Sequence, residues 1–255
     1  MNESPSTLLN AVEEVARKAG NIALHFYRDR PAVEIKADGS PVTIADRNAE
    51  RAAREWIASR FPDDGIVGEE LGASPGRSAR RWIIDPIDGT KSFVAGVPLW
   101  GTLIAVCEGE TVLAGAVYCA AVGEMLVAAD GEGCFLNGSR ARVSAVANLA
   151  EATVLTTGLK FERRPERQAG WQKLVAAARI GRTWGDCYGY LLVATGRAEV
   201  MTDAIVAEWD TAAVQRCVVE AGGVFTDWEG KPTAFGGSAI ATNAFVADEA
   251  RRLLQ

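Results

Sequence analysis

The chain has 255 residues, of which 48% are hydrophobic and 24% are charged, and it carries a formal net charge of −6. This length and composition predict a globular protein, built as one large domain or as two closely packed halves, and they exclude a disordered chain. The acidic balance argues against sequence-independent binding to nucleic acid, which needs a basic surface that releases counterions.

The cysteines and the hydropathy pattern indicate a cytoplasmic protein. None of the five cysteines belongs to a CxxC pair, so neither a disulfide framework nor a zinc site is predicted. The chain shows no run of eighteen apolar residues and no basic N-terminal segment followed by an apolar one. We therefore expect neither a membrane span nor a signal peptide. The single histidine, His25, is predicted to lie on a helix surface.

The N-terminal part predicts a packing helix followed by a short strand. Apolar residues recur at helical spacing over residues 8–26, after Ser4-Pro5 as a helix start. Residues 34–36 predict a strand and residues 37–41 a turn-rich loop, with Lys36 at the base of that loop.

A second helix is predicted over residues 43–61. Thr43 and Asp46 have the spacing of a capping box there, and capping alone is a sufficient role for both. Residues 66–68 then predict a short strand that ends in Glu69-Glu70. A carboxylate pair at the end of a strand is where α/β architectures place ligands, although a solvated loop is the simpler explanation.

The next stretch combines a buried strand with a candidate cation site. The apolar residues 82–84 predict a strand that stops at Asp85-Pro86, because proline donates no hydrogen bond and holds its predecessor extended. Asp85, the carbonyl of Ile87 and Asp88 can converge on one point, which suits a hard cation. Gly89-Thr90 lets the backbone approach a ligand, and a helix beginning there would direct its first N–H groups at an anion. A plain turn is the alternative.

The rest of the chain changes character near residue 145. Before it, strand-like runs separated by hairpin turns predict an antiparallel meander. These runs cover residues 99–106, 111–117, 125–129, 134–136 and 140–143. After it, strands and helices alternate, which is typical of a layered α/β half. The strands are expected at 153–156, 180–183, 198–201, 224–226 and 239–242, and the helices at 168–178, 187–195, 210–221 and up to Leu254. We predict two halves, residues 1–145 and 146–255.

Asp210 begins an apolar-periodic helix directly after Trp209. A carboxylate in the first turn is favoured by the helix dipole whether or not it binds a metal, so structural and functional roles both remain open.

Three separated motifs together resemble the inositol monophosphatase superfamily. They are Gly68-Glu69-Glu70, Asp85-Pro86-Ile87-Asp88-Gly89-Thr90 and Trp209-Asp210-Thr211-Ala212-Ala213. The resemblance implies an α/β/α/β/α layered sandwich and a phosphomonoesterase that uses two to three Mg²⁺ ions. It places one ion on Glu69, Asp85 and the Ile87 carbonyl, and a second on Asp85, Asp88 and Asp210. A third would bind near Glu69.

The same resemblance assigns roles around these ions. Glu69 and Thr90 would orient the attacking water, with Asp46 and Thr43 supporting them. The amides of Gly89 and Thr90 would hold phosphate oxygens, and Lys36 would act electrostatically. Ile87, Asp88 and Asp210 also face the substrate in this assignment, and no covalent intermediate is required.

Two further segments resemble the histidinol-phosphate phosphatase branch. They are residues 99–104 and the run Arg182-Thr183-Trp184-Gly185-Asp186-Cys187-Tyr188-Gly189-Tyr190. We expect Asp186 and its neighbours, Gly185 among them, to contact the cationic leaving group of histidinol phosphate. Arg182 is a candidate for anion binding, with a surface role as the alternative. Trp184 is expected to pack, whereas Asp203 matches an acidic position of the inositol branch.

Other functions remain open on this sequence. An inositol-1-monophosphatase or a broad sugar-phosphate phosphatase would use the same metal site. A 3′,5′-bisphosphate nucleotidase is disfavoured, since no extra basic cluster for a second phosphate is evident. A regulatory binding protein of this fold is disfavoured because the complete set of expected site residues is present: Glu69, Asp85, Asp88, Thr90 and Asp210. The expected partner is a small phosphorylated metabolite, with no nucleic acid and no membrane, and we expect a homodimer by analogy.

Overall fold

The computed structural model describes residues 3–255 apart from Arg30, Asp38, Ser40 and Glu162. Two residues of the loop expected over 37–41, Asp38 and Ser40, therefore lie outside the described residues. The helices are α1 (Pro5–Asp29), α2 (Ile44–Arg60), α3 (Thr90–Ala95), α4 (Gln168–Ala177), α5 (Asp186–Ala194), α6 (Glu208–Glu220) and α7 (Ala247–Leu254), with short 3₁₀ turns at Leu149–Glu151 and Pro165–Arg167. No helix in the described part of the chain is long and apolar enough to span a membrane.

The larger sheet belongs to the first part of the chain. Within the described residues it has eight strands in the order β10-β9-β8-β7-β6-β5-β3-β4. Their bounds are β3 (Gly65–Gly68), β4 (Gly72–Ser74), β5 (Arg80–Asp88), β6 (Gly101–Glu108), β7 (Thr111–Cys119), β8 (Glu124–Ala129), β9 (Gly133–Leu136) and β10 (Ser139–Arg140). From β5 to β10 neighbouring strands are antiparallel, so the meander is confirmed.

The smaller sheet belongs to the second part and is mixed. Its order is β12-β11-β13-β15-β14, in which β11 pairs in parallel with both of its neighbours. The strands are β11 (Thr153–Thr156), β12 (Ile180–Arg182), β13 (Val200–Asp203), β14 (Val224–Thr226) and β15 (Ala239–Thr242). A separate hairpin joins β1 (Val33–Ile35) to β2 (Pro41–Thr43).

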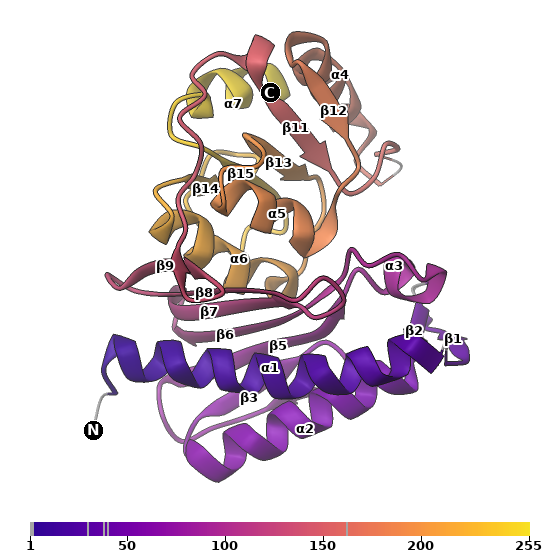
Figure 1. The fold of residues 1–255 in the computed structure, drawn as a ribbon, viewed down its shortest axis with the longest axis vertical. Helices are drawn as coiled ribbons and strands as arrows, with labels where there is room; N and C mark the ends of the chain where they lie inside the picture. The colour runs from indigo at the N-terminus through magenta and orange to yellow at the C-terminus, as the bar shows by residue number, and fades with distance from the viewer. Residues whose placement is uncertain (1–2, 30, 38, 40, 162) are drawn as a thin grey trace.

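Helices and sheets alternate in five layers, as Figure 1 shows from bottom to top. Helices α1 and α2 cover one face of the larger sheet, α5 and α6 lie between the two sheets, and α4 and α7 cover the far face of the smaller sheet. Three apolar cores fill the junctions between the layers, and the one that contains α5 and α6 contacts both sheets. The α/β/α/β/α sandwich is therefore confirmed. The division into residues 1–145 and 146–255 stays a prediction, since α5 and α6 pack in a core shared by both sheets.

Two strand predictions were wrong by three or more residues at their C-terminal ends. Strand β5 does not stop at Asp85-Pro86 but continues to Asp88. Its pairing with β6 shifts register between Asp85 and Asp88, and its partner β3 ends opposite Ile84, so the missing N–H of Pro86 breaks no ladder. The run expected over 140–143 pairs only to Arg140. Val143 donates its N–H to Ala221 instead, because the chain is already leaving the sheet.

A close approach of helix to sheet sets the position of Asp210. A Cβ added to Gly115 on β7 would lie 2.6 Å from the carbonyl oxygen of Ala213 on α6. Because Gly115 has no side chain, the backbone of α6 packs directly against the backbone of β7. Asp210 lies one turn before Ala213, and this packing holds it beside the end of β5.

Candidate active site

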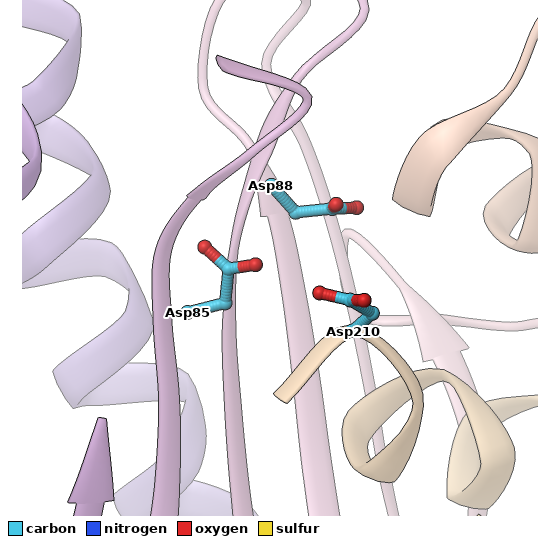
Figure 2. A group of neighbouring side chains, drawn as sticks. All are labelled: Asp85, Asp88 and Asp210. Carbon is cyan, nitrogen blue, oxygen red and sulfur yellow. The ribbon is translucent and has the colours of Figure 1, made fainter. Parts of the chain in front are cut away.

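Three aspartates from distant parts of the chain meet where β5 ends. Asp85 and Asp88 belong to β5, and Asp210 lies in the first turn of α6. One carboxylate oxygen from each lies within 4.8 Å of the others. Figure 2 shows the three side chains directed toward a shared space. The structure therefore brings together the two local ligands and the distant one expected from the sequence.

Backbone hydrogen bonds fix the orientation of each carboxylate. Asp85 accepts the N–H of Ile87 at 3.0 Å, and Asp88 accepts the N–H of Cys187 at the start of α5. Asp210 accepts the N–H of Ala207 at 2.7 Å, as a capping residue does. Asp210 therefore caps α6 and faces the cluster, so both of its expected roles are compatible.

The cluster holds more negative charge than its surroundings neutralise. Burial raises the pKa of Asp85 well above its usual range, and Glu69, Asp88 and Asp210 add to the rise. Burial, Asp186 and Asp210 do the same for Asp88. Burial raises the pKa of Asp210 to about 7, although the Ala207 N–H opposes the shift. Such a group favours protons or cations.

Glu69 lies beside this cluster but is held by a lysine. Its N–H donates to the carbonyl of Ile84 at 3.1 Å, immediately before Asp85. Lys36 Nζ lies 2.9 Å from Glu69 Oε1 and 2.6 Å from Glu70 Oε1. Lys36 therefore supplies the positive charge at this end of the site, which agrees with its expected electrostatic role.

Thr43 and Asp46 form the capping box expected from their spacing. The N–H and the hydroxyl of Thr43 donate to Asp46 Oδ2 at 2.8 and 2.7 Å. The other oxygen, Asp46 Oδ1, is buried and has no hydrogen-bond partner among the described residues. Burial is the main reason that the pKa of Asp46 is raised, and nearby Glu69 contributes.

These residues fit divalent cations. All the side-chain donors are carboxylate oxygens, which hard cations prefer, and their charge is not neutralised by the described groups around them. The orphaned Asp46 Oδ1 is a further acceptor close to Glu69. The Ile87 carbonyl receives the Thr90 hydroxyl at 3.0 Å, which places Thr90 at the same turn.

Two hollows lie next to the aspartate cluster and the turn of Thr90. One of about 80 Å³ is lined by acidic side chains, and the other, of about 350 Å³, follows the start of α3. The first is lined by Asp88, Thr157, Asp186, Tyr190, Asp203, Ile205, Val206 and Asp210. The second includes Gly89, Thr90, Lys91, Thr157, Gly185 and Asp186. Gly89, Thr90, Gly185 and Asp186, which the sequence predicts to bind the substrate, therefore line the second hollow.

Arg182 and Trp184 do not line either of these hollows. Arg182 is exposed, and its guanidinium lies 6.0 Å from the centre of the Trp184 ring. Trp184 lies in the loop between β12 and α5 and is 44% exposed, so its expected packing role stays a prediction. His25 is exposed on α1, as expected.

Thr157 is a site residue that the sequence reasoning missed. Its N–H donates to Asp203 Oδ1 at 3.1 Å, and its hydroxyl accepts the N–H of Asp186 at 2.8 Å. The hydroxyl of Tyr190 donates to the other oxygen of Asp203 at 2.9 Å. Thr157 directly follows β11, and a polar residue at a strand end was the available signal.

Comparison with known proteins supplies the family. Residues 4–254 match the model of the inositol monophosphatase family. The histidinol-phosphatase of Chlorobaculum parvum is 44% identical over 228 residues, which cover 89% of this chain and 88% of that protein. The histidinol-phosphatase of Mycobacterium tuberculosis is 39% identical over 222 residues, covering 85% of each. The crystal structure of the suppressor protein suhB from Bartonella henselae has a TM-score of 0.92 at 29% identity, covering 98% of each chain.

The five-layer fold and the carboxylate cluster define a metal-dependent phosphoric monoester hydrolase. This chain belongs to the inositol monophosphatase family, on a branch that resembles the histidinol-phosphatases. Its substrate is accordingly a small phosphorylated molecule.

Proposed function

We propose that this protein is a Mg²⁺-dependent histidinol-phosphate phosphatase of histidine biosynthesis. The observation that carries the proposal is a second pair of carboxylates, Asp186 and Asp203, which line the same hollow as Asp88 and Asp210. A cationic leaving group gains electrostatic attraction from such a lining, whereas a neutral polyol gains only hydrogen bonds. The similarity to two histidinol-phosphatases supports the same substrate. Homodimer formation and a cytoplasmic location stay predictions.

In this proposal Glu69, Asp85, Asp88, Asp210 and the Ile87 carbonyl hold two to three Mg²⁺ ions. Bound there, the ions would lower the pKa of a water molecule and neutralise the phosphate. The residues of the protein itself would orient the attacking water and hold the phosphate group.

The residues around the ions suit the attack of a water on phosphorus. The Thr90 hydroxyl already donates its proton to the Ile87 carbonyl, so its oxygen can accept a hydrogen bond from the water. The Glu69 carboxylate is a second acceptor, and the capping box of Thr43 and Asp46 lies close to it. At the start of α3, the first N–H groups have no carbonyl partner within the helix and can donate to phosphate oxygens.

A direct comparison of substrates tests the proposal. We expect kcat/KM with Mg²⁺ to be about 100-fold higher on histidinol phosphate than on inositol 1-phosphate, which is about 2.7 kcal/mol of differential transition-state binding. Equal or reversed values would show that the substrate is wrong, while the metal site would be unaffected by that result.

Replacing Asp186 by Asn should selectively impair the cationic substrate. Asp186 has a positive φ of 50°, which Asn tolerates and Ala does not, so Asn removes the charge with the least strain. Losing a charge-assisted contact should lower kcat/KM on histidinol phosphate roughly tenfold to hundredfold. The value on a neutral sugar phosphate, measured in parallel, should change little. An equal loss on both substrates would contradict the assigned role.

One observation favours a second candidate function. Lys91, Lys160, Arg163 and Arg164 line a hollow of about 310 Å³, which shares Thr157, Asp203 and Ile205 with the acidic one. The expectation that no extra basic cluster exists was therefore wrong. Lys91 is about seventy positions away from the other three, and only the fold brings them together. The cluster suits a phosphate ester that carries another anionic group.

The basic hollow is tested with the double variant Arg163→Ala/Arg164→Ala. If doubly anionic esters are substrates, kcat/KM on a sugar bisphosphate should fall roughly tenfold, because two ionic contacts are lost. Histidinol phosphate should be hydrolysed as before. A wild-type protein that does not hydrolyse the bisphosphate would rule this candidate out.

A further inference from the structure

A side chain of helix α2 is hydrogen-bonded to the turn that carries Glu69. The carboxylate of Glu50 is completely buried. It accepts the N–H of Glu70 at 2.7 Å and that of Leu71 at 3.2 Å. The backbone on the C-terminal side of Glu69 is thus anchored to a charged group of α2.

The N-terminal side of the same residue is anchored to strand β5. The N–H of Glu69 donates to the carbonyl of Ile84, the residue before Asp85. Both peptide groups that flank the Glu69 side chain are therefore fixed, one to the strand that carries Asp85 and one to Glu50. The backbone of Glu69 cannot move away from Asp85 without breaking one of these anchors.

Arg54 holds Glu50 in this place. Its Nε donates to Glu50 Oε1 at 2.7 Å, and its two terminal nitrogens donate to the Gly72 carbonyl and, at 3.1 Å, to the Ser74 hydroxyl. Asp46, Glu50 and Arg54 follow one another at intervals of four and so lie on one face of α2. The same helix face thus supports the site at two points, through the capping box and through Glu50.

Gly68 makes room for this carboxylate. A Cβ added there would lie 2.0 Å from Glu50 Oε1 and 2.9 Å from an Arg54 nitrogen. Any side chain at this position would displace the buried pair, so the residue before Glu69 must be glycine for Glu50 to reach the turn.

We propose that Glu50 is a positioning residue that, with Arg54 and Gly68, presets Glu69 for a divalent cation. Groups that orient metal ligands through hydrogen bonds typically change metal affinity without touching the ion. Here the buried carboxylate acts on the backbone of the ligand's turn and not on its side chain. This inference rests on the proposed function for its metal.

Metal binding by the variant Glu50→Gln tests the inference. Gln keeps the volume of Glu but loses the charge, and its NH₂ group cannot accept the backbone N–H. Metal-stripped protein is titrated with Mn²⁺ as a probe, and free Mn²⁺ is followed by electron paramagnetic resonance. We expect the class of site that includes Glu69 to bind about tenfold more weakly, and the site on Asp88 and Asp210 to be unchanged. The Mg²⁺ concentration for half-maximal activity should rise by a similar factor, with kcat at saturating Mg²⁺ retained.

Glu199→Gln is the matched control. Glu199 is also a buried carboxylate that accepts a backbone N–H, from Thr153 at 2.6 Å, but it lies directly before β13 of the smaller sheet. It should lower the melting temperature of the metal-free protein without changing Mn²⁺ affinity. Gly68→Ala, which keeps the carboxylate but displaces it, should reproduce the binding defect of Glu50→Gln.

Three results separate the possibilities. Unchanged Mn²⁺ binding in both Glu50→Gln and Gly68→Ala would overturn the positioning role and leave the proposed function intact. Equal weakening in Glu199→Gln would overturn it too, since the defect would then come from general destabilisation. A wild-type protein that binds no divalent cation would overturn the proposed function and this inference together.

Discussion

Asp85→Asn should abolish most of the phosphatase activity and at the same time stabilise the metal-free protein. Asp85 is 1% exposed, and Glu69, Asp88 and Asp210 all lie close enough to raise its pKa. Indirect supports of metal sites are worth about 10–100-fold, so loss of a direct and central ligand should exceed about 100-fold in kcat/KM. Without metal, however, this buried carboxyl must either carry a charge among like charges or take up a proton, and Asn avoids both costs.

Both halves of this prediction can be measured on one preparation. Steady-state kinetics with Mg²⁺ gives the activity, and thermal unfolding after metal removal gives the stability. Asp64→Asn is a suitable control, because Asp64 is a buried carboxylate directly before β3 of the same sheet, paired with Arg80 and with the Trp82 indole N–H. It should lose stability and keep the activity of the folded fraction. An Asp85→Asn protein that is active, or that melts below the wild type without metal, would contradict the assignment.

The second large effect concerns pH. In the metal-free protein, burial is the main cause that raises the pKa of Asp210 and of Asp186 to about 7, and Asp85 and Asp88 are raised well above their usual range. The folded protein therefore holds protons that the unfolded chain releases near pH 4. The stability that these protons confer is fully present below about pH 4 and is lost as the pH rises through about 7.

The melting temperature of metal-free protein should accordingly fall by several degrees between about pH 5 and pH 8. Saturating Mg²⁺ should raise it most at pH 8, because the cation then replaces the protons. Differential scanning calorimetry across this range, with and without Mg²⁺, measures both slopes. Asp85→Asn should show a shallower slope than the wild type. A metal-free melting temperature that rises with pH would mean that the carboxylates are not in one buried cluster.

The site illustrates which residues short motifs can identify. Asp85 and Asp88 are three residues apart, so local geometry alone brings them near each other. Asp210 is more than one hundred residues away, and only the resemblance to a family joined it to them. The structure then shows a second reason for its place, since Asp210 also caps α6.

The sequence by itself determined the classes of element and the residues with metal-binding chemistry. Periodic apolar residues, turn signals and the capping box of Thr43 and Asp46 are local, so they could be found without a fold. The meander and the alternating second part follow from the same local patterns. Strand ends were less certain, as the continuation of β5 through Pro86 shows, because the need for an N–H depends on the neighbouring strand.

Only the tertiary structure decided what surrounds the site. Three kinds of contact near the site join residues far apart in the chain. Lys36 pairs with Glu69, Thr157 is hydrogen-bonded to both Asp186 and Asp203, and Glu50 accepts the backbone N–H that follows Glu69. Such contacts depend on how the layers pack. The hydrophobic effect that drives this packing is non-directional, so a local sequence pattern does not specify which residues meet. Chemistry can therefore be predicted residue by residue, whereas pKa values, pocket linings and positioning groups are set by burial and by neighbours that only the folded chain supplies.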